Sequence, residues 1–358
     1  MNKKDGSEIV ITGTAVLSPV GLNVEQTCAS IRSAISRFSD HAYYTCLTED
    51  PEWDEEEPLI ASAVPVIDPF LEGPERLYEL TISVLRDLIG IAGIKRKELA
   101  SGGFFMALPQ LDPVVKEWEL QEQFLPNLFC RTGLGGFKVT RINQSAHAGG
   151  YVLMSEAISM LSSGQISFCI LGGVDSYLME DRLGLLDRSR RLKSTRNVDG
   201  FVPGEGASMV LLETAAQAKR RGATIQATLL SVSQGGEPQT IESDKSSSGT
   251  GLTAALRGVQ GFQPNPEIRW VVCDLNGESY RSGEWGIVLC RLAEPFNQLK
   301  ALWHPANCVG DVGAASAGLF IAIACRAFER RYAPASEALL WSSSDSGQRA
   351  ACRIGKPN

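Results

Sequence analysis

The sequence predicts an α/β fold made of two similar halves. Short apolar segments, several rich in β-branched residues and bounded by Gly or Pro, indicate strands. They fall at residues 9–12, 104–108, 168–171, 209–212, 270–273 and 338–341. The order strand, buried helix, strand occurs once around His147 and again around Asp311. This repetition predicts two half-domains that share a core.

The first predicted helix covers residues 78–91. Its apolar side chains Leu80, Val84 and Leu88 are spaced to lie on one face, and Gly93 then ends the pattern. Such a stripe is typical of a helix that covers one side of a sheet.

Two further helices are predicted at residues 151–161 and 313–328. Both are apolar around most of their circumference. A helix of this kind is expected between two sheets rather than at the surface.

The connection between the halves is predicted near residue 215. Residues 214–224 have the composition of a polar crossover helix, and residues 235–251 are rich in Gly, Ser, Thr and Asp and therefore predict a loop. At 358 residues the chain exceeds one typical domain. We expect an N-terminal half at 1–215 and a C-terminal half at 216–358.

Composition and charge exclude several classes of partner. The formal net charge of −7 disfavours binding to nucleic acid or to anionic membranes. No segment approaches about 18 uninterrupted apolar residues, so no membrane span is expected. The first twelve residues lack the apolar run of a signal peptide.

The nine cysteines show no framework spacing. Cys169, Cys273 and Cys290 lie in apolar segments that are predicted to be strands, so these cysteines are expected to be buried free thiols. Free thiols are typical of a reducing compartment, and the chain is therefore expected in the cytoplasm.

Several ordered segments resemble the β-ketoacyl synthases of the thiolase-like superfamily. Residues 8–22 (EIVITGTAVLSPVGL) resemble the opening strand and turn, and residues 144–175 resemble the nucleophile turn, the central helix and the next strand. Residues 199–213 (DGFVPGEGASMVLLE) are similar to the family's DGF-x-x-GEGA segment. Residues 270–279 and 307–317 correspond to the two histidine-bearing loops. The resemblance implies a duplicated thiolase-like fold with five layers, αβαβα.

The same resemblance implies that the family's reactive residues are replaced. His147 stands where the family carries its nucleophilic cysteine, and Asn276 and Asp311 stand where it carries its two histidines. Ala306 takes the position of the lysine, and Ser344 that of the phenylalanine gate. An imidazole cannot hold the acyl chain as a thioester, and a carboxylate repels a developing oxyanion. Ordinary condensation is therefore not expected.

Two interpretations of His147 remain open from the sequence. His147 and Asp311 could form an imidazole–carboxylate pair able to do base chemistry, or His147 could fill space at a helix start and bond to Asp311 or Asn276. The second is favoured because no nucleophile with a recognisable spacing accompanies the pair. Ser145 is predicted to be a helix cap. The chain has no HxxxH or CxxC pair, so no metal or cofactor site is predicted.

Three hypotheses for the function, each of a different class, are compatible with the sequence. The favoured one is a non-catalytic partner subunit or adaptor, either a chain-length-factor-like partner of an active synthase or an adaptor or chaperone for secretion cargo. The alternatives are an acyl hydrolase or decarboxylase that uses His147 with Asp311, and a module that binds an acyl ligand. The family dimerises through the strand before the nucleophile, here residues 137–142, so the resemblance implies a homodimer or heterodimer. An internal strand at these residues is equally compatible with the sequence.

One basic cluster interrupts the acidic charge balance. In the family, basic patches near the pocket receive an acidic acyl carrier protein, so the cluster is a candidate docking site; a solvated loop is the alternative. Its members are Arg188, Arg190, Arg191, Lys193 and Arg196.

Overall fold

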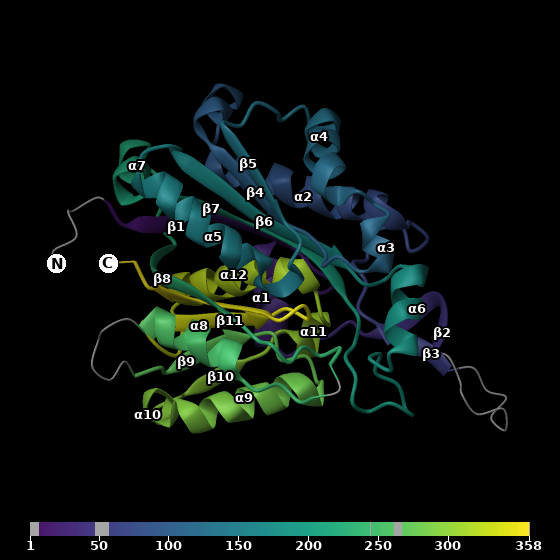
Figure 1. The fold of residues 1–358 in the computed structure, drawn as a ribbon. Helices are drawn as coiled ribbons and strands as arrows, with labels where there is room; N and C mark the ends of the chain where they lie inside the picture. Colours follow the sequence, from purple (N-terminus) through teal and green to yellow (C-terminus); the bar gives the residue numbers. More distant parts are fainter. Residues whose placement is uncertain (1–6, 47–56, 244, 261–266, 358) are drawn as a thin grey trace.

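The computed structural model describes residues 7–46, 57–243, 245–260 and 267–357. Ten strands form one continuous sheet in the order β10-β9-β11-β12-β8-β1-β7-β6-β4-β5. Figure 1 shows that this sheet folds around central helices and carries further helices on its outer faces.

The sheet consists of two five-stranded sets with the same topology. The N-terminal set has the order β1-β7-β6-β4-β5, and the C-terminal set has the order β8-β12-β11-β9-β10. In each set two antiparallel pairings are followed by two parallel pairings. The N-terminal strands are β1 (Ile9–Leu17), β4 (Gly103–Ala107), β5 (Val139–Asn143), β6 (Phe168–Ser176) and β7 (Glu205–Thr214). The C-terminal strands are β8 (Ala227–Gly236), β9 (Trp270–Cys273), β10 (Ala301–Trp303), β11 (Glu337–Ser343) and β12 (Gln348–Gly355).

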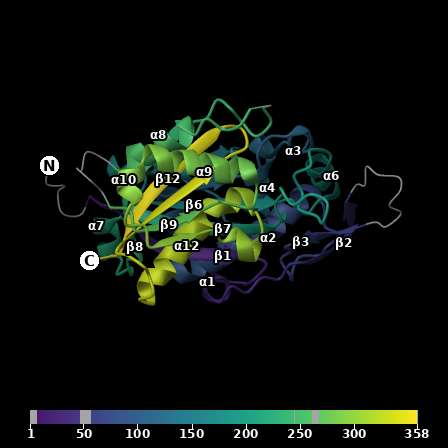
Figure 2. The same ribbon diagram turned by 90° about the horizontal axis from the view of Figure 1, so that it is seen from below.

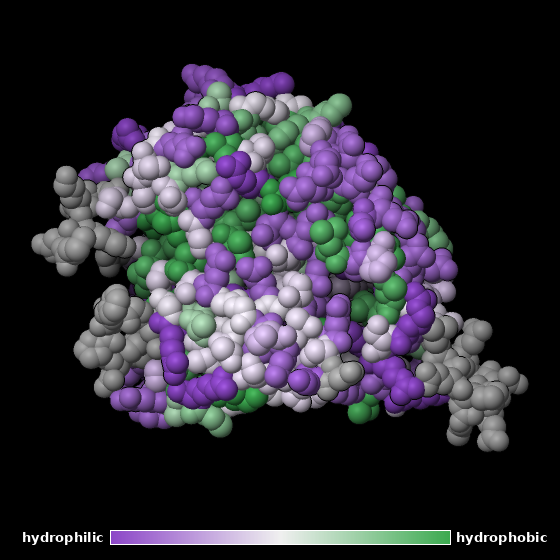
Figure 3. Space-filling model, viewed as in Figure 1, coloured by the Kyte–Doolittle hydropathy of each residue, from purple (hydrophilic) through white to green (hydrophobic). Residues whose placement is uncertain are grey.

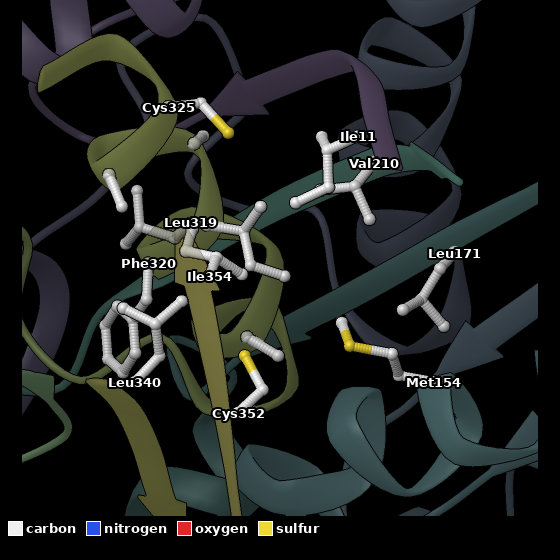
Figure 4. Close-up of a cluster of buried hydrophobic side chains, with 14 of the residues drawn as sticks. Ile11, Met154, Leu171, Val210, Leu319, Phe320, Cys325, Leu340, Cys352 and Ile354 are labelled. Atoms are coloured by element: carbon white, nitrogen blue, oxygen red, sulfur yellow. The ribbon is translucent and has the colours of Figure 1, made fainter. Parts of the chain in front are cut away.

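Two helices form the central layer between the two sets. Helix α5 (Ala146–Ser162) connects β5 to β6, and α12 (Ser316–Glu329), preceded by the 3-10 turn η2 (Gly313–Ala315), takes the equivalent place between β10 and β11. The helices approach closely at Gly150, where an added Cβ would lie 2.6 Å from the Cβ of Ala317. Figure 4 shows the apolar side chains that fill this layer, from Met154 on α5 to Leu319 on α12.

Outer helices cover both sheets (Figure 1). On one side α2 (Gly73–Ala92) packs against β1 and β7, and α4 (Leu120–Thr132) packs against α2. On the other side α8 (Thr250–Gln260) and α9 (Ser279–Arg291) cover the C-terminal set. The two outer cores are separate from the central one. The molecule therefore has the predicted five layers.

The predicted strands and the three predicted helices are confirmed. Helix α2 ends at Ala92, and Gly93 follows it in the left-handed conformation with φ 63°. The loop predicted at 235–251 lies between β8 and α8. The division of the chain at 215 stays a prediction, because β1 and β8 pair with each other and join the two halves in one sheet.

One strand prediction was wrong. Cys290 lies on α9 and is exposed, whereas Cys169 and Cys273 are buried in β6 and β9. Val288 in α9 and Leu292, directly after the helix, are both buried, and Cys290 lies between them on the outer side. A short apolar run cannot by itself distinguish a strand from a helix.

A small hairpin lies outside the main sheet. Strands β2 (Ser39–Cys46) and β3 (Glu57–Ala61) pair with each other and pack near α6 (Glu180–Arg188), as Figure 2 shows from below. Among the helices of the described ranges, none is long and apolar enough to cross a bilayer.

Candidate functional site

The site is built at the start of α5, in the centre of the molecule. Ala146, its first residue, has a φ of 43°, a conformation that non-glycine residues rarely adopt. Ser344, in the turn between β11 and β12, holds this start: its hydroxyl accepts the N–H of Ala148 at 3.0 Å and donates to the carbonyl of Ser145. The turn of the second half thus braces the strained start of the central helix of the first half.

His147 is the second residue of α5 and is 1% exposed. Its Nε2 lies 2.7 Å from Oδ1 of Asp311. Within the described residues, its Nδ1 has no hydrogen-bond partner. The structure therefore brings the two residues together as an imidazole–carboxylate pair.

The position of Asp311 is fixed through its backbone and its carboxylate. Its N–H donates to the carbonyl of Val202 and its carbonyl accepts from the N–H of Gly204, so the DGF-x-x-GEGA segment holds it in place. Its carboxylate also accepts the N–H of Gly313 at 2.9 Å and the side-chain amide of Asn276 at 2.8 Å. Both carboxylate oxygens thus have partners.

These contacts shift the pKa values of both His147 and Asp311. Burial disfavours the charged form of each group. Attraction to His147, the hydrogen bond with it, and Arg281 together outweigh burial and hold the pKa of Asp311 well below its usual range. For His147, burial lowers the pKa, but the charge and hydrogen bond of Asp311, with a further contribution from Asp274, raise it overall. His147 therefore stays protonated, as an imidazolium beside the Asp311 carboxylate, to a higher pH than a free histidine does.

Five charged residues continue from this pair and form what we call the central ion-pair network. Arg191 donates to Glu278 at 2.7 Å and to Asp345 at 2.7 Å. Arg281 donates to Asp274 at 2.9 Å and to Asp345 at 3.1 Å. The side-chain amide of Asn276 links Glu278 to Asp311. The network consists of Arg191, Asp274, Glu278, Arg281 and Asp345.

The space beside the pair is very small. A cavity lined by Asn276, Ala306, Asp311 and other residues has a volume of about 10 Å³. That is about the space of one water molecule. A separate cleft of about 590 Å³ is lined by Ala146, Arg191 and Asp345, among others. The space available to a ligand therefore lies in the cleft beside Ala146 and Arg191 rather than in the small cavity beside Asp311.

Ser145 does not have the role predicted for it. It occupies the N-cap position of α5, but its side chain makes no capping hydrogen bond. Its hydroxyl lies 3.4 Å from the side-chain oxygen of Gln348. Ser344 binds the helix start instead, because the turn before β12 reaches α5 at this point.

The basic cluster is divided between surface and interior. The side chains of Arg188, Arg190, Lys193 and Arg196 are exposed. Arg191, in contrast, is 16% exposed and bound to two carboxylates, so its prediction as a docking cation needs correction. Burial opposes the charge of Arg191, but Asp345 and Glu278 raise its pKa well above the usual value.

Sequence reasoning missed most of the central ion-pair network. One signal was available, because Asp274 directly follows β9 and Asp345 lies two residues after β11. Carboxyl ends of neighbouring parallel strands meet at one edge of a sheet. Over the described ranges, His, Cys, Asp and Glu side chains form no group of three or more that could hold a metal ion.

Comparisons with known proteins agree with this fold. The family model described as "Beta-ketoacyl synthase, N-terminal domain" matches residues 131–218, which contain β5, α5 and β6. A chain of the ishigamide ketosynthase/chain length factor superposes with a TM-score of 0.80 over 99% of this chain and 100% of that one, at 16% identity. Residues 131–218 are thus similar in sequence to β-ketoacyl synthases, and the whole chain is similar in fold to ketosynthases. Its fold is thiolase-like over nearly its whole length.

Two further matches show the same similarity. It is 31% identical over 137 residues to the mitochondrial 3-oxoacyl-[acyl-carrier-protein] synthase of Arabidopsis thaliana, a match that covers 34% of this chain and 30% of the relative. A type II polyketide ketosynthase, solved with its acyl-carrier protein, superposes with a TM-score of 0.77 over 99% of this chain and 100% of that one, at 16% identity. The sequence match thus spans less than a third of the curated relative.

Proposed function

We propose that the ketosynthase-like chain is a non-catalytic partner subunit of an active ketosynthase, comparable in role to a chain length factor. The observation that carries this proposal is the buried pair of His147 and Asp311. By resemblance, His147 takes the place of the nucleophilic thiol, and the imidazole is bound to a carboxylate 2.7 Å away. Such a group cannot form the thioester on which condensation depends.

The surroundings of the pair support the same proposal. A carboxylate at Asp311 opposes negative charge on a thioester oxygen, where the reaction needs hydrogen-bond donors. The cavity of about 10 Å³ has no space for an acyl chain. This small volume also argues against acyl binding beside Asp311.

Hydrolysis or decarboxylation by the pair is less well supported. A general base must be unprotonated at the working pH, and the raised pKa of His147 favours its protonated form. The nearest candidate nucleophile in sequence, Ser145, contacts Gln348 and not the imidazole. The pair is better suited to holding two segments of the chain together.

The strand β5 supports a role in a complex. It is the last strand of the ten-stranded sheet and pairs only with β4 among the described strands. A free edge of this kind can pair with a strand of another subunit. Figure 3 shows hydrophobic side chains gathering on the upper half of the visible face, which carries β5 and α5 in Figure 1. Two structures of similar fold are a ketosynthase/chain length factor and a ketosynthase solved with its acyl-carrier protein.

The decisive experiment is purification of the tagged chain from its native host at endogenous level, with mass spectrometry of what accompanies it. We expect a ketosynthase that retains its cysteine, in a one-to-one complex. The complex should keep its condensing activity when His147 is replaced by Gln in this chain. Recovery of secretion cargo without a synthase would replace the proposal by the adaptor function.

The exposed basic residues offer a second test. Charge reversal by Lys193→Glu with Arg196→Glu should weaken capture of an acidic acyl carrier protein by the complex, because rim charges steer association. Arg37→Glu, an exposed arginine outside the cluster, serves as the matched control. Equal capture by both variants would remove the cluster from the interface.

A further inference from the structure

A second cavity lies on the other side of the short helix α11 (Ala306–Val309). It is bounded by α1 (Val24–Arg32), the end of β10, α11 and α12, and Figure 2 shows α1 and α12 close together in this region. Its volume is about 260 Å³. Asn307 and Cys308 line this cavity, whereas Ala306 and Val309 line the small one beside Asp311. The turn of α11 thus separates two distinct spaces.

The walls of this second cavity are mostly apolar. Trp303 and Tyr332 stack with ring centroids 6.3 Å apart, and Ile31 and Ile323 contribute aliphatic surface. Two thiols also line it. Burial raises the pKa of Cys28 to about 12, partly offset by Arg326, and burial raises the pKa of Cys308 as well. Both thiols are neutral at physiological pH. They therefore contribute apolar surface to the wall of the cavity and do not act as nucleophiles.

The mouth of the cavity carries a positioned cation. The guanidinium of Arg32 lies 4.5 Å from the centroid of the Tyr332 ring, which holds the flexible side chain at the rim. His304 and Asn307 supply further polar groups, and no carboxylate is among the described residues that line the cavity. The rim is therefore complementary to an anion.

Size and polarity together select one class of ligand. A dry cavity of about 150 Å³ holds a benzene molecule, so 260 Å³ can hold an apolar body somewhat larger than one ring. Binding pockets of small molecules combine mostly apolar walls with a few polar groups. We propose that this cavity binds a medium-chain carboxylate, with the alkyl chain between Trp303 and Ile323 and the carboxylate at Arg32.

The proposal does not depend on the role of His147, because the site lies on the opposite side of α11. Its test is isothermal titration calorimetry of the full chain with octanoate and, as an uncharged analogue, 1-octanol. We expect one octanoate per chain. Arg32→Gln should weaken octanoate roughly tenfold, since a hydrogen bond to a charged group is lost, and should leave 1-octanol unchanged.

Two further variants locate the binding. Ile31→Trp fills the half-buried side of the cavity and should abolish binding of both ligands, with thermal unfolding used to verify the fold. Arg37→Gln removes an exposed charge outside the cavity and should change nothing. Absence of octanoate binding, retained binding in Ile31→Trp, or equal affinity in Arg32→Gln and Arg37→Gln would each overturn the proposal.

Discussion

The guanidinium of Arg191 lies 2.7 Å from the carboxylate of Asp345. This ion pair joins the segment after α6, in the first half, to the turn between β11 and β12, in the second. Glu278 binds the same guanidinium from a third segment. The site is therefore closed by charges that come from distant parts of the chain.

Replacing Arg191 by Met should destabilise the fold strongly. The change leaves Glu278 and Asp345 without their shared cation, and breaking a buried pair costs about 3 kcal/mol or more. Urea denaturation should show this loss in the free energy of unfolding. The matched control is Arg188→Met, an exposed change expected to stay within about 0.5 kcal/mol. Equal stability of the two variants would contradict the structural role of the network.

The contribution of His147 should depend on pH. Its pKa is raised in the folded state, so its stabilisation is fully present below the unfolded pKa of about 6.5 and is lost as pH rises through the higher folded value. The difference in unfolding free energy between the wild type and His147→Gln should therefore shrink as the pH rises above about 6.5. Denaturation series at several pH values measure it. A difference that stays flat or grows with pH would contradict the ion pair.

Placing a thiol at position 147 should not give condensing activity. In His147→Cys the new thiol would be buried beside the Asp311 carboxylate, and both effects disfavour a thiolate. We expect no condensation product from acyl and malonyl thioesters and no alkylation at this position by iodoacetamide. Peptide mapping provides an internal control, because the exposed Cys130 and Cys290 should be alkylated. Product above the background of His147→Ala would show that one substitution is enough to revive the site.

The free edge of β5 should be sensitive to added charge. Thr140 is exposed on this strand, and Thr140→Lys should weaken pairing with another subunit because lysines on edge strands oppose such contacts. Analytical ultracentrifugation of the chain, alone or with its partner, should show a shift toward the monomer at unchanged thermal stability. Thr224→Lys, exposed between α7 (Ala215–Arg220) and β8, should have no effect. A complex that is unchanged by Thr140→Lys would exclude this edge as the interface.

The sequence predicted the layers better than it predicted the contacts of the site. The buried helices α5 and α12 were evident from their uniform apolarity, which local composition records. The role of Arg191 was not evident, because its partners Glu278 and Asp345 lie 87 and 154 positions away. From the sequence alone, a charged residue in a basic run is predicted to be solvent-exposed. Only the folded structure shows that distant carboxylates bind it.

The assignment of His147 followed from resemblance and not from periodicity. The similarity of residues 144–175 to the family's nucleophile turn and central helix gave its position, and the structure adds the contact with Asp311. That Ser344 rather than Ser145 binds the helix start depends on the path of the turn before β12. No local sequence pattern predicts the path of this turn.

The strained start of α5 at Ala146 has a consequence for how this chain can change over time. Active sites commonly sacrifice stability to keep reactive groups unpaired and poised. Here the groups around the same backbone position are paired with one another, from His147 to Asp345. Because each of these groups is the partner of another, a substitution at any one of them leaves a charged or polar group unpaired in the interior. Changes within this network should therefore be tolerated only in compensating pairs.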